Sequence, residues 1–180
     1  MVQIKTDNDF YKDKVMLRAN HLPHGDLRVL DCFAGKGVIW RGVQYCTGRR
    51  ISVLPIDSRF DVFSVLHGDN VDYLYSLDLS RFNIIDLDAY GIPYRQLKAL
   101  FTRGYSGTVF VTFIQTAMGG IPFGLLEEIG FNSAMVKKTP VLFFKRGWDY
   151  FKQWLAENGV TQITHRSYNR KHYLVMLLNS

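Results

Sequence analysis

Short apolar runs alternate with amphipathic stretches along the first two thirds of the chain, and this alternation constrains the fold most strongly. Strands that alternate with helices form βαβ units, which place parallel strands in one sheet and helices on both of its faces. The run over 108–114 is almost wholly apolar or β-branched, as expected of a strand that is buried on both sides. The pattern predicts strands over 28–31, 51–56, 62–66, 82–86 and 108–114, and helices over 8–20, 36–46, 70–78 and 93–103.

The last third of the chain follows a different pattern. Pro122 and Gly130 bracket a short helix over 122–129. Two β-prone runs, 160–168 and 171–178, meet at a polar turn and predict a terminal hairpin. One further helix is expected from four apolar residues that share a helical face: Phe144, Trp148, Phe151 and Leu155. The sequence therefore predicts one α/β domain over residues 1–180, with a mostly parallel sheet of seven strands that ends in an antiparallel hairpin.

The first expected strand runs into an acid and then into a turn with two glycines. Asp31 stands at the carboxyl end of that strand, where open α/β sheets bind their ligands. Gly35 and Gly37 carry no Cβ, so the backbone can approach a ligand closely. A phosphate-binding P-loop does not fit, because Gly37 stands where that motif requires a hydroxyl. The dinucleotide fingerprint fits poorly because Trp40 replaces its third glycine. A purely structural turn remains an alternative.

This run resembles the first motif of the class I S-adenosylmethionine-dependent methyltransferases, in the form Asp-x-Phe-Ala-Gly-x-Gly. The resemblance implies a Rossmann-like sheet with S-adenosylmethionine as cofactor. The residues that match the motif, and that it implies bind the cofactor, are Asp31, Phe33, Ala34, Gly35 and Gly37.

Two further acids follow the next two expected strands. Asp57 ends the second strand, and a carboxylate at that position can accept hydrogen bonds from ribose hydroxyls. The family resemblance implies this role for Asp57, and implies that Asp69, with Asn70 beside it, contacts the adenine. The alternatives are a solvated loop acid at Asp57, and ordinary turn chemistry at Asp69 with Asn70 as a helix cap.

A second motif follows the fourth strand, in Ile-Ile-Asp-Leu-Asp-Ala-Tyr-Gly over 84–91. It resembles the Asp/Asn-Pro-Pro-Tyr/Phe loop of methyltransferases that modify exocyclic amines. The most similar form is the Asp-Leu-Asp-Pro-Tyr-Gly of the tRNA guanine-N2 dimethyltransferases. Asp88, Tyr90 and Gly91 match this form, and Ala89 replaces its proline. The resemblance places Asp86 with the cofactor-binding residues and implies that Asp88, Ala89 and Tyr90 are catalytic.

The chemistry explains why such residues would be grouped. The amine of an aromatic base is a poor nucleophile, and acceptors that hold its N–H bonds can turn its lone pair toward the methyl donor. The Asp88 carboxylate and the Ala89 carbonyl are candidate acceptors, and Tyr90 could stack on the base. Alanine leaves this loop less rigid than proline does. The alternatives are a core aromatic at Tyr90 beside Tyr94, and solvated or helix-capping roles for the two acids.

The net charge of +6 permits a nucleic-acid partner, RNA or DNA. Basic residues gather late in the chain and are expected to form a positive face: Lys137, Lys138, Lys145, Arg146, Arg166, Arg170, Lys171 and His172. A solvated hairpin turn is the alternative for these charges. No separate recognition domain fits into 180 residues, so specificity is expected from loops, a second copy of the chain or a partner protein.

Other classes of protein are disfavoured. No apolar run approaches the roughly 18 residues that a bilayer-spanning segment needs, and the start of the chain has no signal-peptide pattern. Cys32 and Cys46 lack the spacing of a zinc site or a disulfide scaffold, so we expect no metal and a cytoplasmic location. Two alternatives to a nucleobase methyltransferase remain, namely an inactive scaffold subunit of this fold and an enzyme that methylates a protein or a small molecule.

Overall fold

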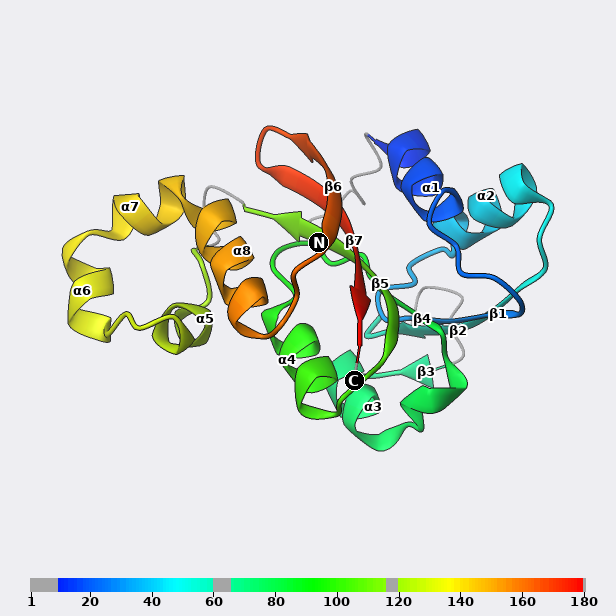
Figure 1. Cartoon of the computed structure of the whole chain (residues 1–180), viewed down its shortest axis with the longest axis horizontal. Coiled ribbons are helices and arrows are strands. Elements are labelled where there is room, and N and C mark those ends of the chain that lie inside the picture. Colours follow the sequence, from blue (N-terminus) through cyan, green and yellow to red (C-terminus); the bar gives the residue numbers. More distant parts are fainter. Residues whose placement is uncertain (1–9, 60–65, 116–119, 180) are drawn as a thin grey trace.

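The computed structural model describes residues 10–59, 66–115 and 120–179, and they form one mixed sheet with helices around it (Figure 1). The seven strands lie in the order β3-β2-β1-β4-β5-β7-β6. All neighbouring pairs from β3 to β5 are parallel, whereas β7 is antiparallel to both β5 and β6. The strands are β1 Leu27–Asp31, β2 Ile51–Asp57, β3 Leu66–His67, β4 Ile84–Leu87, β5 Gly107–Ile114, β6 Ile163–Tyr168 and β7 Lys171–Leu178. The predicted α/β architecture, with its terminal hairpin, is confirmed.

Eight α-helices and a short 3₁₀ turn are seen in the described ranges. They are α1 Tyr11–Ala19, α2 Val38–Thr47, α3 Asn70–Ser76, the 3₁₀ turn Leu79–Arg81, α4 Tyr94–Thr102, α5 Phe123–Glu128, α6 Ser133–Lys138, α7 Pro140–Lys145 and α8 Gly147–Glu157. Among these helices, none combines the length and the apolar composition that crossing a bilayer requires.

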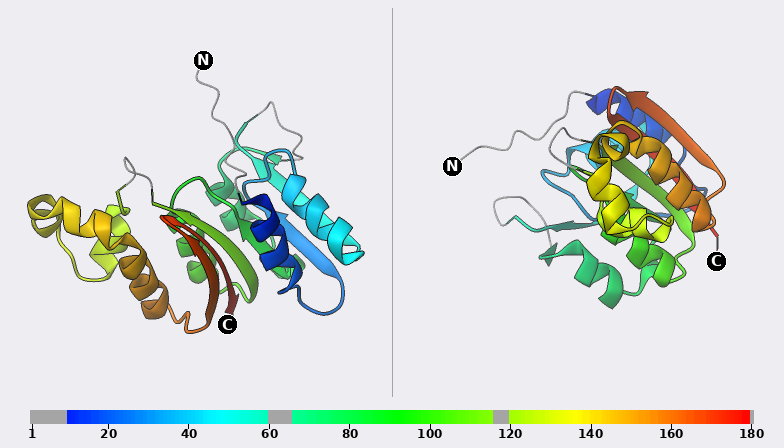
Figure 2. Two further views of the ribbon diagram at one scale, coloured as in Figure 1. Left: turned by 90° about the horizontal axis from the view of Figure 1, so that it is seen from above. Right: turned by 90° about the vertical axis from the view of Figure 1, so that its left-hand side faces the viewer.

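The sheet has a hydrophobic core on each face, because successive side chains of a strand point to opposite sides. On one face α1 and α2 lie side by side, with Trp40 and Val43 packed on Val29 and Phe110 (Figure 2). On the other face α3, α4 and α8 cover residues of opposite parity, such as Ile85. This alternation decides which polar side chains at the strand ends meet α1.

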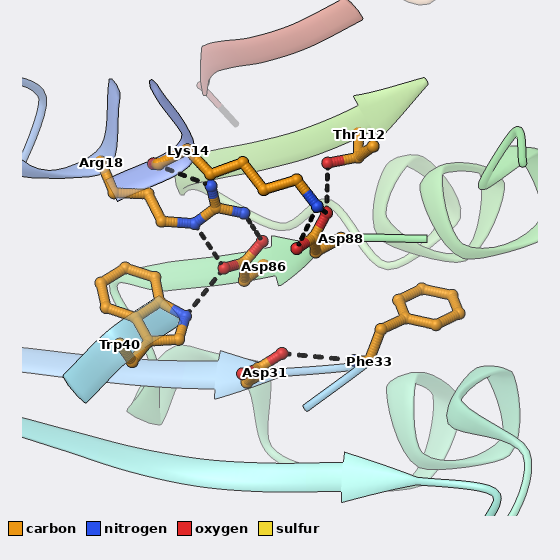
Figure 3. Close-up of polar contacts among 8 residues, drawn as sticks. All are labelled: Lys14, Arg18, Asp31, Phe33, Trp40, Asp86, Asp88 and Thr112. Carbon is orange, nitrogen blue, oxygen red and sulfur yellow. Dashed lines mark hydrogen bonds and ion pairs between the residues drawn. The ribbon is translucent and has the colours of Figure 1, made fainter. Parts of the chain in front are cut away.

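The register of β1 and β4 brings two predicted site residues together. Asp31 is directly opposite Asp86 in the parallel pair, and both side chains lie on the face that α1 covers (Figure 3). Asp88, two residues further along, extends from the same face and meets Thr112 of β5. The carboxyl ends of β1, β4 and β5 thus carry a compact polar group, with α1 above it.

The segment before the hairpin differs from the prediction. The four apolar residues expected on one helix belong to two, since Phe144 lies in α7 and the other three lie in α8. The Gln115 amide donates to the carbonyls of Phe143 and Phe144, so the end of α7 bonds to the residue that follows β5 instead of to a continuing helix. A Cβ at Gly147 would collide with the same amide, which is why α8 begins with glycine. α6 also lies where no element was predicted.

The third strand was predicted over 62–66. Residues 62–65 lie outside the described ranges, and β3 is seen at Leu66–His67.

Candidate functional site

The glycine turn after β1 adopts the backbone conformation that its sequence suggests. Gly35 and Gly37 have φ angles of 52° and 63°, in the left-handed region that glycine enters readily. Gly37 is the residue before α2, and a Cβ built on it would meet no atom of the described residues within 4 Å, whereas a Cβ on Gly35 would lie 3.5 Å from the Arg59 guanidinium. At Gly37 the turn therefore presents bare backbone at the start of α2.

Asp57, at the end of β2, lies against this turn. Its carboxylate accepts from the Gly35 N–H at 2.9 Å and from the Arg59 N–H at 2.9 Å. Burial opposes ionisation of Asp57, but the hydrogen bonds from Arg59 and Gly35 outweigh it and lower the pKa of the carboxyl. Asp57 is a buried, ionised acceptor and not a solvated loop acid. The Arg59 side chain also donates to both of its oxygens, at 3.2 and 3.4 Å, so a further donor would take the place of this exposed side chain.

Phe33 and Ala34 tie the turn to its neighbours. The Phe33 N–H donates to the Asp31 carboxylate at 3.3 Å, and the Ala34 N–H donates to the Ile56 carbonyl at 3.0 Å. These two hydrogen bonds, one to a side chain and one to a backbone carbonyl, fix the path of the turn between β1 and β2.

Asp69 and Asn70, which follow β3, have different roles that could not be distinguished from the sequence. Asp69 caps α3 by accepting from the Val71 N–H at 2.9 Å, and its other oxygen pairs with Arg95 at 3.2 Å. Asn70 is not the cap. Its buried amide donates to the Cys32 carbonyl at 2.8 Å and so holds the start of α3 against the end of β1.

Asp86 is enclosed by α1 and α2 (Figure 3). It is 1% exposed, and Arg18 of α1 donates to both of its oxygens at 2.7 Å. The Trp40 indole N–H of α2 donates to the same carboxylate at 2.7 Å. The bidentate pair satisfies the buried charge with matched geometry, so Asp86 neither faces solvent nor caps a helix.

Asp88 is held by α1 as well. Lys14 donates to both of its oxygens, at 2.8 and 3.0 Å, and the Thr112 hydroxyl donates to one of them. Ala89 is buried beside it, whereas Tyr90 is 68% exposed. The interpretation of Tyr90 as a core aromatic is therefore wrong, and its ring is accessible at the end of β4.

The charges of this cluster do not cancel. Three carboxylates, of Asp31, Asp86 and Asp88, face the two cations of Lys14 and Arg18. Burial works against the charge of Asp88, but Lys14 and Arg18 outweigh it and lower its pKa. Burial raises the pKa of Asp86, although Arg18 opposes the rise.

Asp31 is the unpaired member of the cluster. It is 5% exposed, and within the described residues it accepts only from the Phe33 N–H. Burial, followed by the charges of Asp86 and Asp88, raises the pKa of its carboxyl well above the usual range. The site thus offers a carboxyl group without a cationic partner beside the glycine turn, and a positively charged ligand there would favour its ionised form.

The effect of this carboxylate on stability has a definite sign. A carboxyl whose pKa is higher in the folded than in the unfolded state binds more protons when folded, so stability falls as the pH rises through the interval between the two values. We expect Asp31→Asn to raise the free energy of unfolding of the ligand-free protein at pH 7 by about 1–3 kcal/mol. Urea titrations at several pH values should show that the gain shrinks toward acidic pH. A gain in stability that grows toward acidic pH would contradict a raised pKa of Asp31 in the folded state.

The sequence prediction missed the partners of these acids, namely Lys14, Arg18, Trp40 and Thr112. A signal was present, because Lys14 and Arg18 stand four residues apart on the face of α1 that also carries Val15. Two acids in a buried strand require cations nearby, and this helix supplies them.

The expected positive face is only partly present. His172 is 7% exposed and stacks on Trp148, with ring centroids 4.1 Å apart, so it does not belong to a surface. Arg166 pairs with Asp13, and the Arg170 guanidinium lies over the Phe144 ring. Several of these cations thus have partners within the protein.

Two hollows of the described surface lie away from the strand-end site. One, of about 240 Å³, lies between α4 and the start of β6 and is lined by Leu100, Tyr105 and Thr161 among others. The other, of about 460 Å³, lies on α2. The strand-end site is recognised by its backbone conformation, charge and register.

Comparison with known proteins places the fold. No family model matches the chain, and no curated protein matches it significantly. Solved structures do match. A candidate S-adenosyl-L-methionine-dependent methyltransferase from Methanococcus maripaludis superposes with a TM-score of 0.54 at 12% identity, over 94% of this chain and 85% of that one. A Podospora anserina methyltransferase with bound S-adenosylhomocysteine gives 0.54 at 12% identity, over 93% and 77%.

A third match has no methyltransferase in its description. It is described as a possible exported protein from Bordetella parapertussis, with a TM-score of 0.58 at 11% identity over 96% of this chain and 68% of that one. Identities this low establish architecture alone. The chain has the Rossmann-like fold of the class I methyltransferases, with a mostly parallel seven-stranded sheet and an antiparallel terminal hairpin.

Proposed function

We propose that this protein is an S-adenosylmethionine-dependent methyltransferase whose acceptor is an exocyclic amine of a nucleobase in RNA or DNA. One observation carries the first part. In a sheet of this strand order, a left-handed glycine turn, the buried Asp57 carboxylate and the uncompensated Asp31 carboxylate adjoin at neighbouring strand ends.

The residues at this edge fit the cofactor. S-adenosylmethionine would supply an electrophilic methyl group on a cationic sulfonium. Asp57 would accept hydrogen bonds from ribose hydroxyls in place of those from the Arg59 side chain, and the backbone at Gly35 and Gly37 would allow close approach. Asp31 would balance a positive charge of the ligand, and Asp69, which is partly exposed, would meet the adenine edge.

The residues after β4 support an amine acceptor. The Asp88 carboxylate and the Ala89 carbonyl would accept the amine N–H bonds, and the exposed ring of Tyr90 would stack on the base. Lys14 and Thr112 fix the orientation of the Asp88 side chain before a substrate arrives. A base within a duplex would first have to leave its stack.

The substrate class can be tested without a known acceptor. We expect a labelled methyl group to pass from S-adenosylmethionine into the RNA or DNA fraction of a cell lysate when the purified protein is added. Nuclease treatment should release the label as a modified nucleoside. Label in the protein or small-molecule fraction alone would show a different acceptor class.

A scaffold role is the second candidate, and two observations favour it. Both oxygens of Asp88 already accept hydrogen bonds inside the protein, and Ala89 stands where the resembling motif has proline. Tight binding of S-adenosylhomocysteine without transfer into any lysate fraction would support that role over catalysis.

A further inference from the structure

Away from the strand-end site, a positively charged surface lies on α2, and its arginines have no acidic partners within the described residues. Within the described residues, Arg41 donates to the Lys36 carbonyl at 2.7 Å and Arg49 donates to the Pro23 carbonyl at 2.9 Å. Neither of them, nor Arg50, pairs with a carboxylate there. Four other exposed arginines do pair with an aspartate, namely Arg59, Arg95, Arg146 and Arg166.

The local sequence concentrates this charge. Residues 32–56 contain four cations, Lys36, Arg41, Arg49 and Arg50, and no aspartate or glutamate. The segment runs from the glycine turn through α2 into β2, and α2 lies at one edge of the molecule (Figure 2). An acid-free stretch of this kind attracts anions from solution.

The surface also has shape and an aromatic ring. Arg41, Gln44 and Tyr45 share the outer side of α2, at spacings of three and four residues. Together with Gly48, Arg49 and Arg50 they line the hollow of about 460 Å³ noted above. Tyr45 is 93% exposed, so its ring is free on both faces for a planar group. We call these six residues the α2 arginine face.

The chemistry of this face selects one class of partner. Guanidinium groups bind phosphate oxygens in a bidentate manner, and an exposed aromatic ring stacks on an unpaired base. We propose that the α2 arginine face binds the phosphate backbone of a single-stranded nucleic acid, with a base stacked on Tyr45. The helix is about 15 Å long and begins at the glycine turn, so a bound strand would lead toward the strand-end site. The inference extends the proposed function by locating where the nucleic-acid partner is held.

Fluorescence anisotropy tests the face directly, with a labelled mixed-sequence oligonucleotide of about 16 nucleotides. We expect Arg41→Gln/Arg50→Gln to weaken binding and to lower the slope of log affinity against log salt by about 1.4, the contribution of two phosphate contacts. Tyr45→Ala should weaken binding by about 5- to 150-fold with little change in that slope.

A matched control variant removes two positive charges from a different helix, α6. Lys137→Gln/Lys138→Gln on α6 should leave the affinity within about twofold of the parent value, although its net charge equals that of the arginine variant. The proposal is overturned if the lysine variant loses as much affinity as the arginine variant, or if the parent shows no binding at about 100 µM protein. Equal affinity for a duplex of the same sequence would also contradict it.

Oligonucleotide binding and cofactor binding are measured separately, so each tests a different proposal. Loss of oligonucleotide binding with intact binding of S-adenosylhomocysteine would remove this inference alone. Oligonucleotide binding at the α2 arginine face without any cofactor binding would remove the proposed function alone.

Discussion

Replacing Arg18 by methionine is expected to lower the free energy of unfolding by about 3–5 kcal/mol. The substitution keeps most of the side-chain volume but leaves Asp86 buried at 1% exposure without its bidentate partner. An unpaired buried carboxylate takes up a proton more readily, so the deficit should grow as the pH rises. Urea denaturation of the parent and the variant at pH 5 and pH 8 measures both effects.

Two variants make this result specific. Arg166→Met breaks an exposed ion pair between β6 and Asp13, which lies on α1 as Arg18 does. This variant should lower the free energy of unfolding by about 1 kcal/mol or less. Arg18→Met/Asp86→Asn removes the stranded charge while keeping an oxygen for the Trp40 indole, and should recover most of the lost stability. If Arg18→Met costs no more than Arg166→Met, the pair is not the compensated buried charge described here.

Replacing Asp88 by alanine is expected to lower methyl transfer by about 10²-fold or more, while binding of the cofactor changes little. The reason is geometric, because loss of the acceptor frees the amine to rotate away from the methyl donor, and small misplacements have large kinetic effects. Asp88→Asn keeps one acceptor oxygen and should retain far more activity than Asp88→Ala. Single-turnover transfer of labelled methyl into the responsive nucleic-acid fraction measures this difference.

The alanine variant also strands Lys14, so stability must be controlled. Lys14→Met/Asp88→Ala removes both members of the pair and should unfold at a denaturant concentration close to that of the parent. If this folded double variant transfers methyl groups at the parent rate, Asp88 has no part in the reaction. Equal loss in Asp88→Asn and Asp88→Ala would show that the charge, and not the acceptor, matters.

Much of the fold could be predicted from local patterns. The apolar run that ends at Asp31 and the paired runs around Asn169 each carry their own signal, and both elements are present. Asn169 even adopts the positive φ of 54° that a tight turn favours. The break between α7 and α8 could not be predicted in this way, because it depends on Gln115 from another part of the chain.

In the candidate site, too, some residues could be predicted from local sequence and others could not. Asp31, Gly35, Gly37 and Asp57 could be predicted, because they lie at or directly after the ends of expected strands. The contacts of Asp86 and Asp88 depend on which helix covers their face of the sheet, and the sequence pattern of the strand does not reveal that helix. Lys14 and Arg18 complete the site from a helix more than 60 residues earlier in the sequence.

Calorimetric titration of S-adenosylhomocysteine into two glycine variants tests the cofactor site most directly. Gly37 and Gly48 flank α2 and have φ angles of 63° and 66°, and no atom of the residues that the structure describes lies within 4 Å of a Cβ built on either. Alanine should strain either backbone by about 1–2 kcal/mol. We expect the parent and Gly48→Ala to bind alike and Gly37→Ala to bind about tenfold more weakly or worse, because only its methyl group enters the glycine turn. Equal affinity in the two variants, or no binding to the parent at about millimolar ligand, would contradict a cofactor site at this edge of the sheet.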